Sequence, residues 1–261
     1  MARLSIGAAW EETLVFVKRE GTLLFPVALV FLALPAVVLQ LFLPDRMRHM
    51  ATMEEVNAAP DLPPSFLLAM FGVILIGLLG TLAIYALSLR PGISVAEALQ
   101  LALRRMPVLI GAGLLLMLGF SMLILIFSII GDGLVAVTGT SASVSILILI
   151  GVPIAMFAIV RLLLLNAVVL DQPVNSIEAI RHSWRLTIGQ FWKLAGFLIG
   201  LIVLMLVSQL VSRMIFGIAG SLIGGSTLAA LLAGLAVAVV NAVLQVYYLI
   251  MTCRIYRQLR G

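Results

Sequence analysis

Few residues of this sequence have the types and the spacing that catalysis or metal binding requires. The two histidines, His49 and His182, each lack a second histidine at the spacing of a metal-ligand pair. The single cysteine, Cys253, excludes a disulfide framework and a cysteine-based metal cluster within the chain. The motifs of zinc proteases, α/β-hydrolases and P-loop proteins do not occur. The sequence therefore predicts a protein that is not an enzyme and that uses no cofactor and no metal.

Polar residues inside long apolar runs are the next candidates, because a polar side chain in lipid is costly unless it has a partner. Arg161 lies near one end of such a run, so its guanidinium can extend to the membrane surface. Asp171 follows at the membrane edge, where we expect it to be solvated or paired with Arg161. Asn241 and Gln245, four residues apart, share a helix face and can hydrogen-bond across a contact between helices.

Small residues form a stripe along another apolar run. Gly196, Gly200, Ser208 and Ser212 recur at helical spacing. Such stripes let helix backbones approach closely. We therefore expect this helix and the one that carries Asn241 to pack tightly against each other or against a neighbour, rather than to line a polar transport path.

Three short segments combine apolar residues at helical spacing with a basic polar face. A capping-box pattern opens the second with Ser94 and Glu97, and the third with Asn175 and Glu178. Such segments are expected to lie in the headgroup plane of a membrane. The three segments are Leu4–Glu20, Ser94–Met106 and Asn175–Ile188.

The elements that must position these residues are membrane-spanning helices. Hydrophobic residues make up 63% of the 261 residues and charged residues only 10%, against roughly 45–50% and about 25% in soluble domains. About 20 apolar residues cross the hydrocarbon layer as a helix, and six runs are long enough. These runs are Thr22–Leu43, Ser65–Leu89, Pro107–Ile130, Val144–Asn166, Phe191–Gly217 and Leu228–Cys253.

The basic residues predict the orientation of these spans. Twelve lysines and arginines fall on the side that carries both termini and the amphipathic segments, and two, Arg46 and Arg48, fall on the other. The positive-inside rule therefore places both termini in the cytoplasm. The twelve are Arg3, Lys18, Arg19, Arg90, Arg104, Arg105, Arg181, Arg185, Lys193, Arg254, Arg257 and Arg260.

The predicted fold is thus an all-α, polytopic transmembrane bundle of six spans, with three amphipathic interfacial helices on the cytoplasmic side. Residues 1–261 form a single membrane domain. The same layout predicts a threefold repeat of one interfacial helix and a two-span hairpin, in residues 1–89, 90–166 and 167–261.

One stretch is similar to a known family. The run VRLLLLNAVVLDQPVNSIEAIRHSWRLTIGQFWKL, from Val160 to Leu194, resembles the membrane domain fused to some bacterial glycerophosphoryl diester phosphodiesterases, and related uncharacterised six-span proteins of bacterial inner membranes. In that group, an arginine near the end of the fourth span precedes an acidic residue and a helix of the form EA[IL]RxSWxLTxGxFW. The matching positions here are Arg161, Asp171, Glu178, Ala179, Ile180, Arg181, Ser183, Trp184, Leu186, Thr187, Gly189, Phe191 and Trp192.

The resemblance implies a six-span fold in a bacterial inner membrane. It does not imply phosphodiesterase activity, because the fused enzymes carry a soluble barrel with catalytic histidines and metal-binding acids that this sequence does not contain. It also implies that the motif is structural. Trp184, Phe191 and Trp192 would lie in the headgroup belt, and Arg181 and Arg185 would meet lipid phosphates.

The function that we expect is non-enzymatic: the organisation of protein partners or lipids at the cytoplasmic face. The partners would be anionic lipid headgroups and a protein or a second copy of the chain, but not nucleic acid, because the basic residues flank apolar runs. The residues expected to make these contacts are Arg181, Trp184, Arg185, Trp192, Lys193, Arg104 and Arg105. The residues expected to act inside the membrane are Arg161, Asp171, Asn241, Gln245, Gly196 and Gly200.

Two alternatives remain open at this point. The first is a transporter or permease component, coupled to a soluble ATPase through the helix at 175–188. It predicts a polar cavity lined by Arg161, Asn166, Asn241 and Gln245. The second is a membrane-embedded lipid enzyme, which the absence of a visible nucleophile, base or metal set disfavours.

Overall fold

A computed structural model describes residues 4–42, 63–138, 142–223 and 226–260. Every secondary-structure element in these residues is helical. The sequence-based predictions for Arg3, Arg46, Arg48 and His49 lie outside them. The helices are α1 (Ile6–Ala28), η1 (Leu29–Ala33, a π-helical turn), α2 (Leu34–Phe42), α5 (Pro64–Leu89), α6 (Val95–Thr138), α7 (Ala142–Leu162), α8 (Leu165–Asp171), α9 (Ser176–Leu186), α10 (Phe191–Ile223) and α11 (Ser226–Arg260).

Within the described residues, six helical stretches are long and apolar enough to cross a membrane. This confirms the number of spans predicted from the apolar runs. The chain is therefore a multi-pass membrane protein in its architecture. The stretches are Ile6–Leu39, Pro64–Leu89, Val95–Gly133, Leu149–Asp171, Phe191–Phe216 and Gly234–Arg260.

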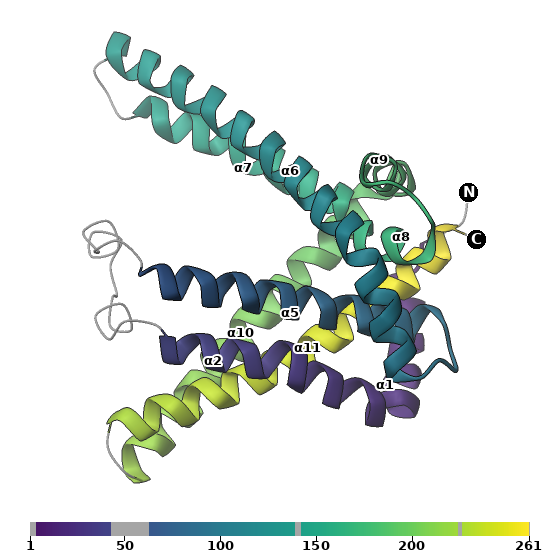
Figure 1. The fold of residues 1–261 in the computed structure, drawn as a ribbon. Coiled ribbons are helices and arrows are strands. Elements are labelled where there is room, and N and C mark those ends of the chain that lie inside the picture. Colours follow the sequence, from purple (N-terminus) through teal and green to yellow (C-terminus); the bar gives the residue numbers. More distant parts are fainter. Residues whose placement is uncertain (1–3, 43–62, 139–141, 224–225, 261) are drawn as a thin grey trace.

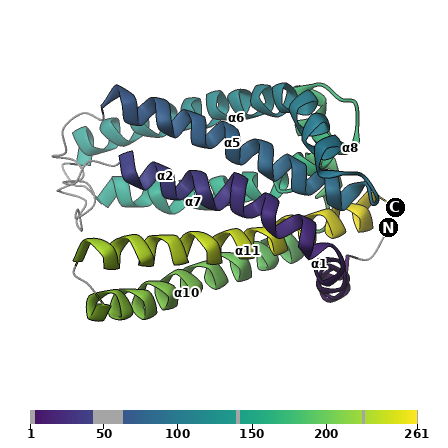
Figure 2. The same cartoon turned by 60° about the horizontal axis from the view of Figure 1, so that its bottom comes forward.

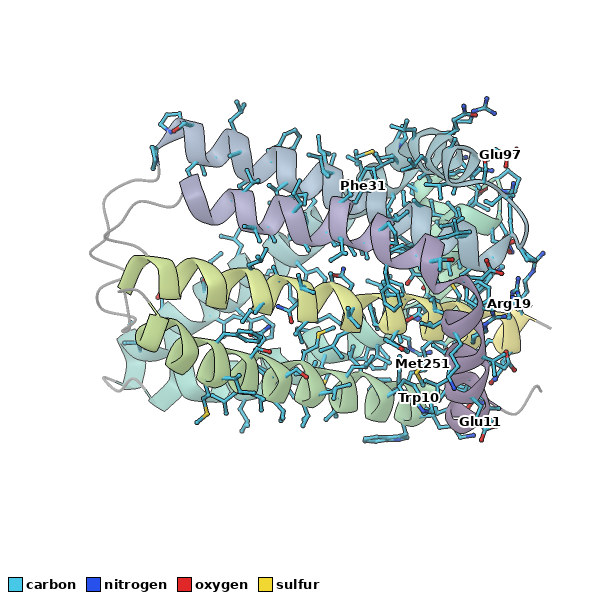
Figure 3. The ribbon with its side chains drawn as sticks, turned by 90° about the horizontal axis from the view of Figure 1, so that it is seen from below. Trp10, Glu11, Arg19, Phe31, Glu97 and Met251 are labelled. Atoms are coloured by element: carbon cyan, nitrogen blue, oxygen red, sulfur yellow. The ribbon has the colours of Figure 1, made fainter. Side chains whose placement is uncertain are left out.

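The boundaries of the first and third spans differ from the prediction, because the amphipathic segments before them are not separate helices. The segment at 4–20 is the first half of α1, and the segment at 94–106 is the start of α6. Figure 3 shows the first half of α1, with Trp10 and Glu11, crossing the end of the bundle before the chain bends near Arg19. Figure 1 shows α6 bending before the long segment beside α7. Pro107 lies inside α6, where its ring and missing N–H kink a helix without ending it.

The capping box predicted for α6 is confirmed. The backbone N–H of Ser94 donates to Glu97 Oε2 at 2.8 Å, and the backbone N–H of Glu97 donates to Ser94 Oγ at 3.2 Å. The two bonds use N–H groups that have no partner within the helix. They explain why α6 begins at Val95.

Three helical hairpins meet at one end of the molecule and diverge toward the other. Figure 1 shows these hairpins, formed by α2 and α5, by α6 and α7, and by α10 and α11. Both termini lie at the end where they meet, with α8, α9 and the first half of α1 (Figures 1 and 2). Buried residues are densest at 82–88, at 163–170 except Asn166, and at 249–256 except Arg254. These stretches lie in α5, around the start of α8 and in α11, nearest this end. The core is therefore concentrated there.

Helix α11 is the centre of this core. It contacts α1, η1, α2, α5, α8 and α10. A second close contact joins η1 to α5, where Phe31 lies between the two helices (Figure 3). A Cβ atom added at Gly80 would lie 2.3 Å from the Cβ of Phe31. Only glycine permits this approach of the two backbones.

Candidate functional site

The candidate site is built around α9, which is held at a break between α7 and α8. Helix α7 ends at Leu162, so the carbonyl of Arg161 lies in its last turn, where carbonyls lack partners within the helix. The Ser183 hydroxyl donates to this carbonyl at 3.0 Å. The Thr187 hydroxyl lies 3.4 Å from the same oxygen and donates to the Trp184 carbonyl at 3.0 Å. Both hydroxyl-bearing residues are fully buried. The motif thus joins α9 to the helix break.

The side chain of Arg161 lies among aromatic rings. Its guanidinium is 4.9 Å from the ring centre of Phe157 and 5.6 Å from that of Trp184. The Phe157 ring also packs edge-on against Trp184, with ring centres 5.7 Å apart, and against Phe191, with ring centres 5.2 Å apart. Such contacts stabilise a cation through the quadrupole of the ring. Arg161 therefore connects α7 to α9, and Phe157 connects α7 to the start of α10.

The beginning of α9 is fixed to α6 by a second anchor. The Ser176 hydroxyl donates to the carbonyl of Val108 at 2.8 Å. A Cβ atom at Gly111 would lie only 2.6 Å from Ser176 Oγ, so this contact needs a glycine. The backbone N–H of Asn175 donates to Glu178 Oε2 at 3.2 Å, as the predicted capping box requires. Helix α9 is consequently held at both ends.

One stripe of α9 remains exposed while the opposite residues are buried. Ala179 and Ser183 face the bundle with no exposed surface. Arg181, Trp184 and Arg185 lie on the exposed stripe. Trp184 has 38% of its surface exposed, so one part of the ring contacts Arg161 while another part remains accessible. The sequence-predicted contact residues of α9 are therefore held together on a fixed helix.

Asp171 does not pair with Arg161. Its carboxylate accepts a hydrogen bond from the Tyr256 hydroxyl at 2.7 Å and forms an ion pair with Arg260. The prediction of an Arg161 partner is wrong because α8 continues for two turns past the helix break and carries Asp171 to the end of α11. Asp171 therefore joins α8 to α11.

The other predicted contact residues are distributed around the same end of the molecule. Lys193 donates from Nζ to the carbonyl of Leu4 at 3.0 Å, which ties α10 to the start of the chain. Trp192 has 84% of its surface exposed. Arg104 is exposed and Arg105 is half-buried, both before the kink of α6. The structure does not bring these four residues into one site with α9.

The residues predicted to pack inside the membrane are arranged differently from expectation. Asn241 and Gln245 are half-buried on α11. Gly196 and Gly200 are exposed, and a Cβ atom at either would meet nothing within 4 Å. The predicted tight packing of spans five and six against each other therefore does not occur at these two glycines. Their packing against a neighbouring molecule stays a prediction.

Ser176, Gly111 and Phe157 are parts of the site that the sequence analysis missed. Phe157 precedes Arg161 by four residues, which is one helical turn, so a cation–π pair was readable from spacing. The Ser176 contact joins residues 68 positions apart and has no local signal. In the part of the chain that the structure describes, no group of three His, Cys, Asp or Glu side chains could hold a metal ion.

Comparison with known proteins returns no match for this chain among protein-family models, curated protein sequences or solved structures.

Proposed function

We propose that this chain is a non-enzymatic multi-pass membrane protein that organises protein partners or lipids at one face of the membrane through α9. The observation that carries the proposal is the fixed position of α9. Its buried side is fastened to Arg161 and Val108, and its exposed stripe offers Arg181, Trp184 and Arg185. A helix held in this way presents these three side chains in one preorganised arrangement, which lowers the entropic cost of binding a partner or a lipid.

We further propose that this face is the cytoplasmic face of a bacterial inner membrane. The basic residues predicted to be cytoplasmic, so far as the structure describes them, lie on segments at the end that carries both termini (Figure 1), and the positive-inside rule assigns such residues to the cytoplasm. The first half of α1, the start of α6 and α9 would lie in the headgroup plane there. With one hairpin after each, they would form the threefold repeat suggested by the sequence.

Photo-crosslinking in native membranes tests the organising role. A photoreactive phenylalanine analogue at position 184 or 185 should give protein or lipid adducts above background, because both positions are on the exposed stripe. The matched control is position 100, exposed at the start of α6 and outside the stripe of α9. Adducts at 184 and 185 no more abundant than at 100 would contradict the proposal.

The same observations favour this role over a transporter component. Of the four residues expected to line a polar cavity, Arg161 is engaged with Phe157 and Trp184. Asn166 is half-buried on α8, and Asn241 and Gln245 are half-buried on α11. Cysteine substitutions at Arg161, Asn166, Asn241 and Gln245 should stay unreactive toward hydrophilic thiol reagents in membranes. Reaction at all four would favour the transport alternative.

A further inference from the structure

A shallow, open groove lies along α6 beside the start of α9. Its volume is about 680 Å³, and its α6 wall includes Pro107, Gly111, Leu114 and Leu118. From residue 107 to residue 118, a helix extends about 16 Å at about 1.5 Å per residue. One leaflet of the hydrocarbon layer is about 15 Å thick, half of the whole layer. The groove therefore matches one acyl chain in length and in polarity.

A second hollow continues the groove onto α9. Ile177 lines both, so the two adjoin at this side chain. The second hollow has a volume of about 380 Å³ and is lined by Ile180, Arg181, Trp184 and Arg185 as well. The surface therefore changes from purely apolar on α6 to cationic and aromatic on α9, which is the polarity sequence of a phospholipid from its tail to its headgroup.

The two arginines that line the second hollow make it positively charged, which favours an anionic ligand. Among the described residues, neither Arg181 nor Arg185 forms an ion pair. The neighbouring carboxylate of Glu178 caps α9 through the N–H of Asn175. Arginine presents a planar fork of donors that matches phosphate geometry. Two such groups one turn apart favour a ligand with net negative charge over a zwitterion, whose own cation they would repel.

We propose that the two hollows form one binding site for an anionic glycerophospholipid. Its phosphate lies between Arg181 and Arg185 beside Trp184, and one acyl chain follows α6 from Pro107 to Leu118. The inference rests on the proposed function and narrows it to one lipid class and one place. Gly111 and Ser176 are positioning residues, because their contact holds α9 against the groove.

Quenching of Trp184 fluorescence by brominated lipid tests this site. The chain has three tryptophans, so Trp10→Phe and Trp192→Phe leave Trp184 as the single reporter in the full-length protein. This variant is reconstituted in two lipid mixtures. In the first, phosphatidylglycerol brominated on one acyl chain is a minor component in phosphatidylcholine. In the second, brominated phosphatidylcholine is a minor component in phosphatidylglycerol. The preference is the ratio of the apparent association constants of the two brominated lipids. We expect phosphatidylglycerol to be preferred about tenfold or more.

Matched variants test which side chains produce the preference for phosphatidylglycerol. Arg181→Gln with Arg185→Gln should bring the ratio close to one, whereas Lys18→Gln with Arg90→Gln removes the same charge at exposed positions outside the hollows and should leave it unchanged. Leu115→Phe with Leu118→Phe fills the groove and should weaken the binding of both lipids. Met122→Phe with Leu125→Phe changes the exposed face of the same helix beyond the groove and should leave the binding of both lipids unchanged.

Equal quenching by the two lipids, or a preference that survives loss of both arginines, would overturn the lipid site. A second copy or another protein crosslinked at position 185 in place of lipid would also overturn it, yet would leave the proposed organising function standing. Lipid adducts without protein adducts at 184 and 185 in native membranes, with the phosphatidylglycerol preference intact, would instead count against protein partners and support the lipid site.

Discussion

Arg161 contributes to the packing of α9 through two different groups. Its carbonyl accepts the Ser183 hydroxyl at the end of α7, and its guanidinium lies against Phe157 and Trp184. The sequence marked Arg161 as a polar residue near a membrane edge, and its guanidinium does lie beside a tryptophan predicted for the headgroup belt. Its carbonyl could not be anticipated, because the helix break at Leu163 has no proline or glycine to announce it.

Ser183→Ala should destabilise the protein by about 1 kcal/mol, because it removes the hydroxyl that satisfies a carbonyl at a buried helix end. The midpoint of thermal unfolding in detergent measures this effect. Ser128→Ala, at an exposed position on α6, is the control and should leave the midpoint unchanged. Equal midpoints for both variants would show that the Ser183 hydroxyl does not hold α9 in place.

Tyr256→Phe should cost more stability than Arg260→Gln, although both remove a partner of Asp171. The Tyr256 hydroxyl donates to the carboxylate at 2.7 Å from a fully buried residue, and a hydrogen bond to a charged group contributes about 1.5–3 kcal/mol. The Arg260 side chain is 53% exposed, and exposed pairs contribute about 0–1 kcal/mol. Unfolding midpoints of the two variants in the same detergent decide the order. The reverse order would mean that the ion pair is the stronger link.

At the scale of elements, the number of spans was easier to predict from the sequence than whether a span continues into the amphipathic segment before it. Length and hydropathy were sufficient for the six spans, because the hydrocarbon layer fixes how many apolar residues a helix needs. The same criteria could not reveal that α1 and α6 each include an amphipathic segment and a span. The predicted spans begin at Thr22 and Pro107, but both residues lie within helices. A single helix-breaking residue can bend a helix without ending it.

Gly80→Ala should destabilise the contact between η1 and α5 by about 1–3 kcal/mol, because the added methyl group would overlap Phe31. Gly72→Ala on the same helix is the matched control, since a Cβ atom there meets nothing within 4 Å. It should be neutral or slightly stabilising. Thermal unfolding in detergent compares the two. Equal loss in both variants would point to an effect of helix propensity and not to the close approach.

At the scale of the molecule, the proposed orientation makes a prediction about access from water. In a Cys253→Ala background, Glu54→Cys lies in the predicted outer connection and Gln100→Cys lies on the exposed start of α6. A membrane-impermeant maleimide should label position 54 in intact cells and position 100 only after permeabilisation. Labelling of position 100 in intact cells, and of position 54 only after permeabilisation, would show the opposite orientation, with α9 on the outer face.

The contact of α1 with α11 has a consequence for the synthesis of the protein. The first helix packs against the last one, and the backbone N–H of Ser5 donates to Gln258 Oε1 at 3.1 Å. Ribosomes extend a chain at about 5–20 residues per second, so α1 waits roughly 10–50 s for its partner. During that interval α5 and η1 can already pack against α1, but the side of α1 that faces α11, where Arg254 lies over the Phe16 ring, has only lipid or an insertion factor to cover it. Packing of α1 against α11 therefore comes late in assembly, and a chain truncated before α11 leaves that side of its first helix uncovered.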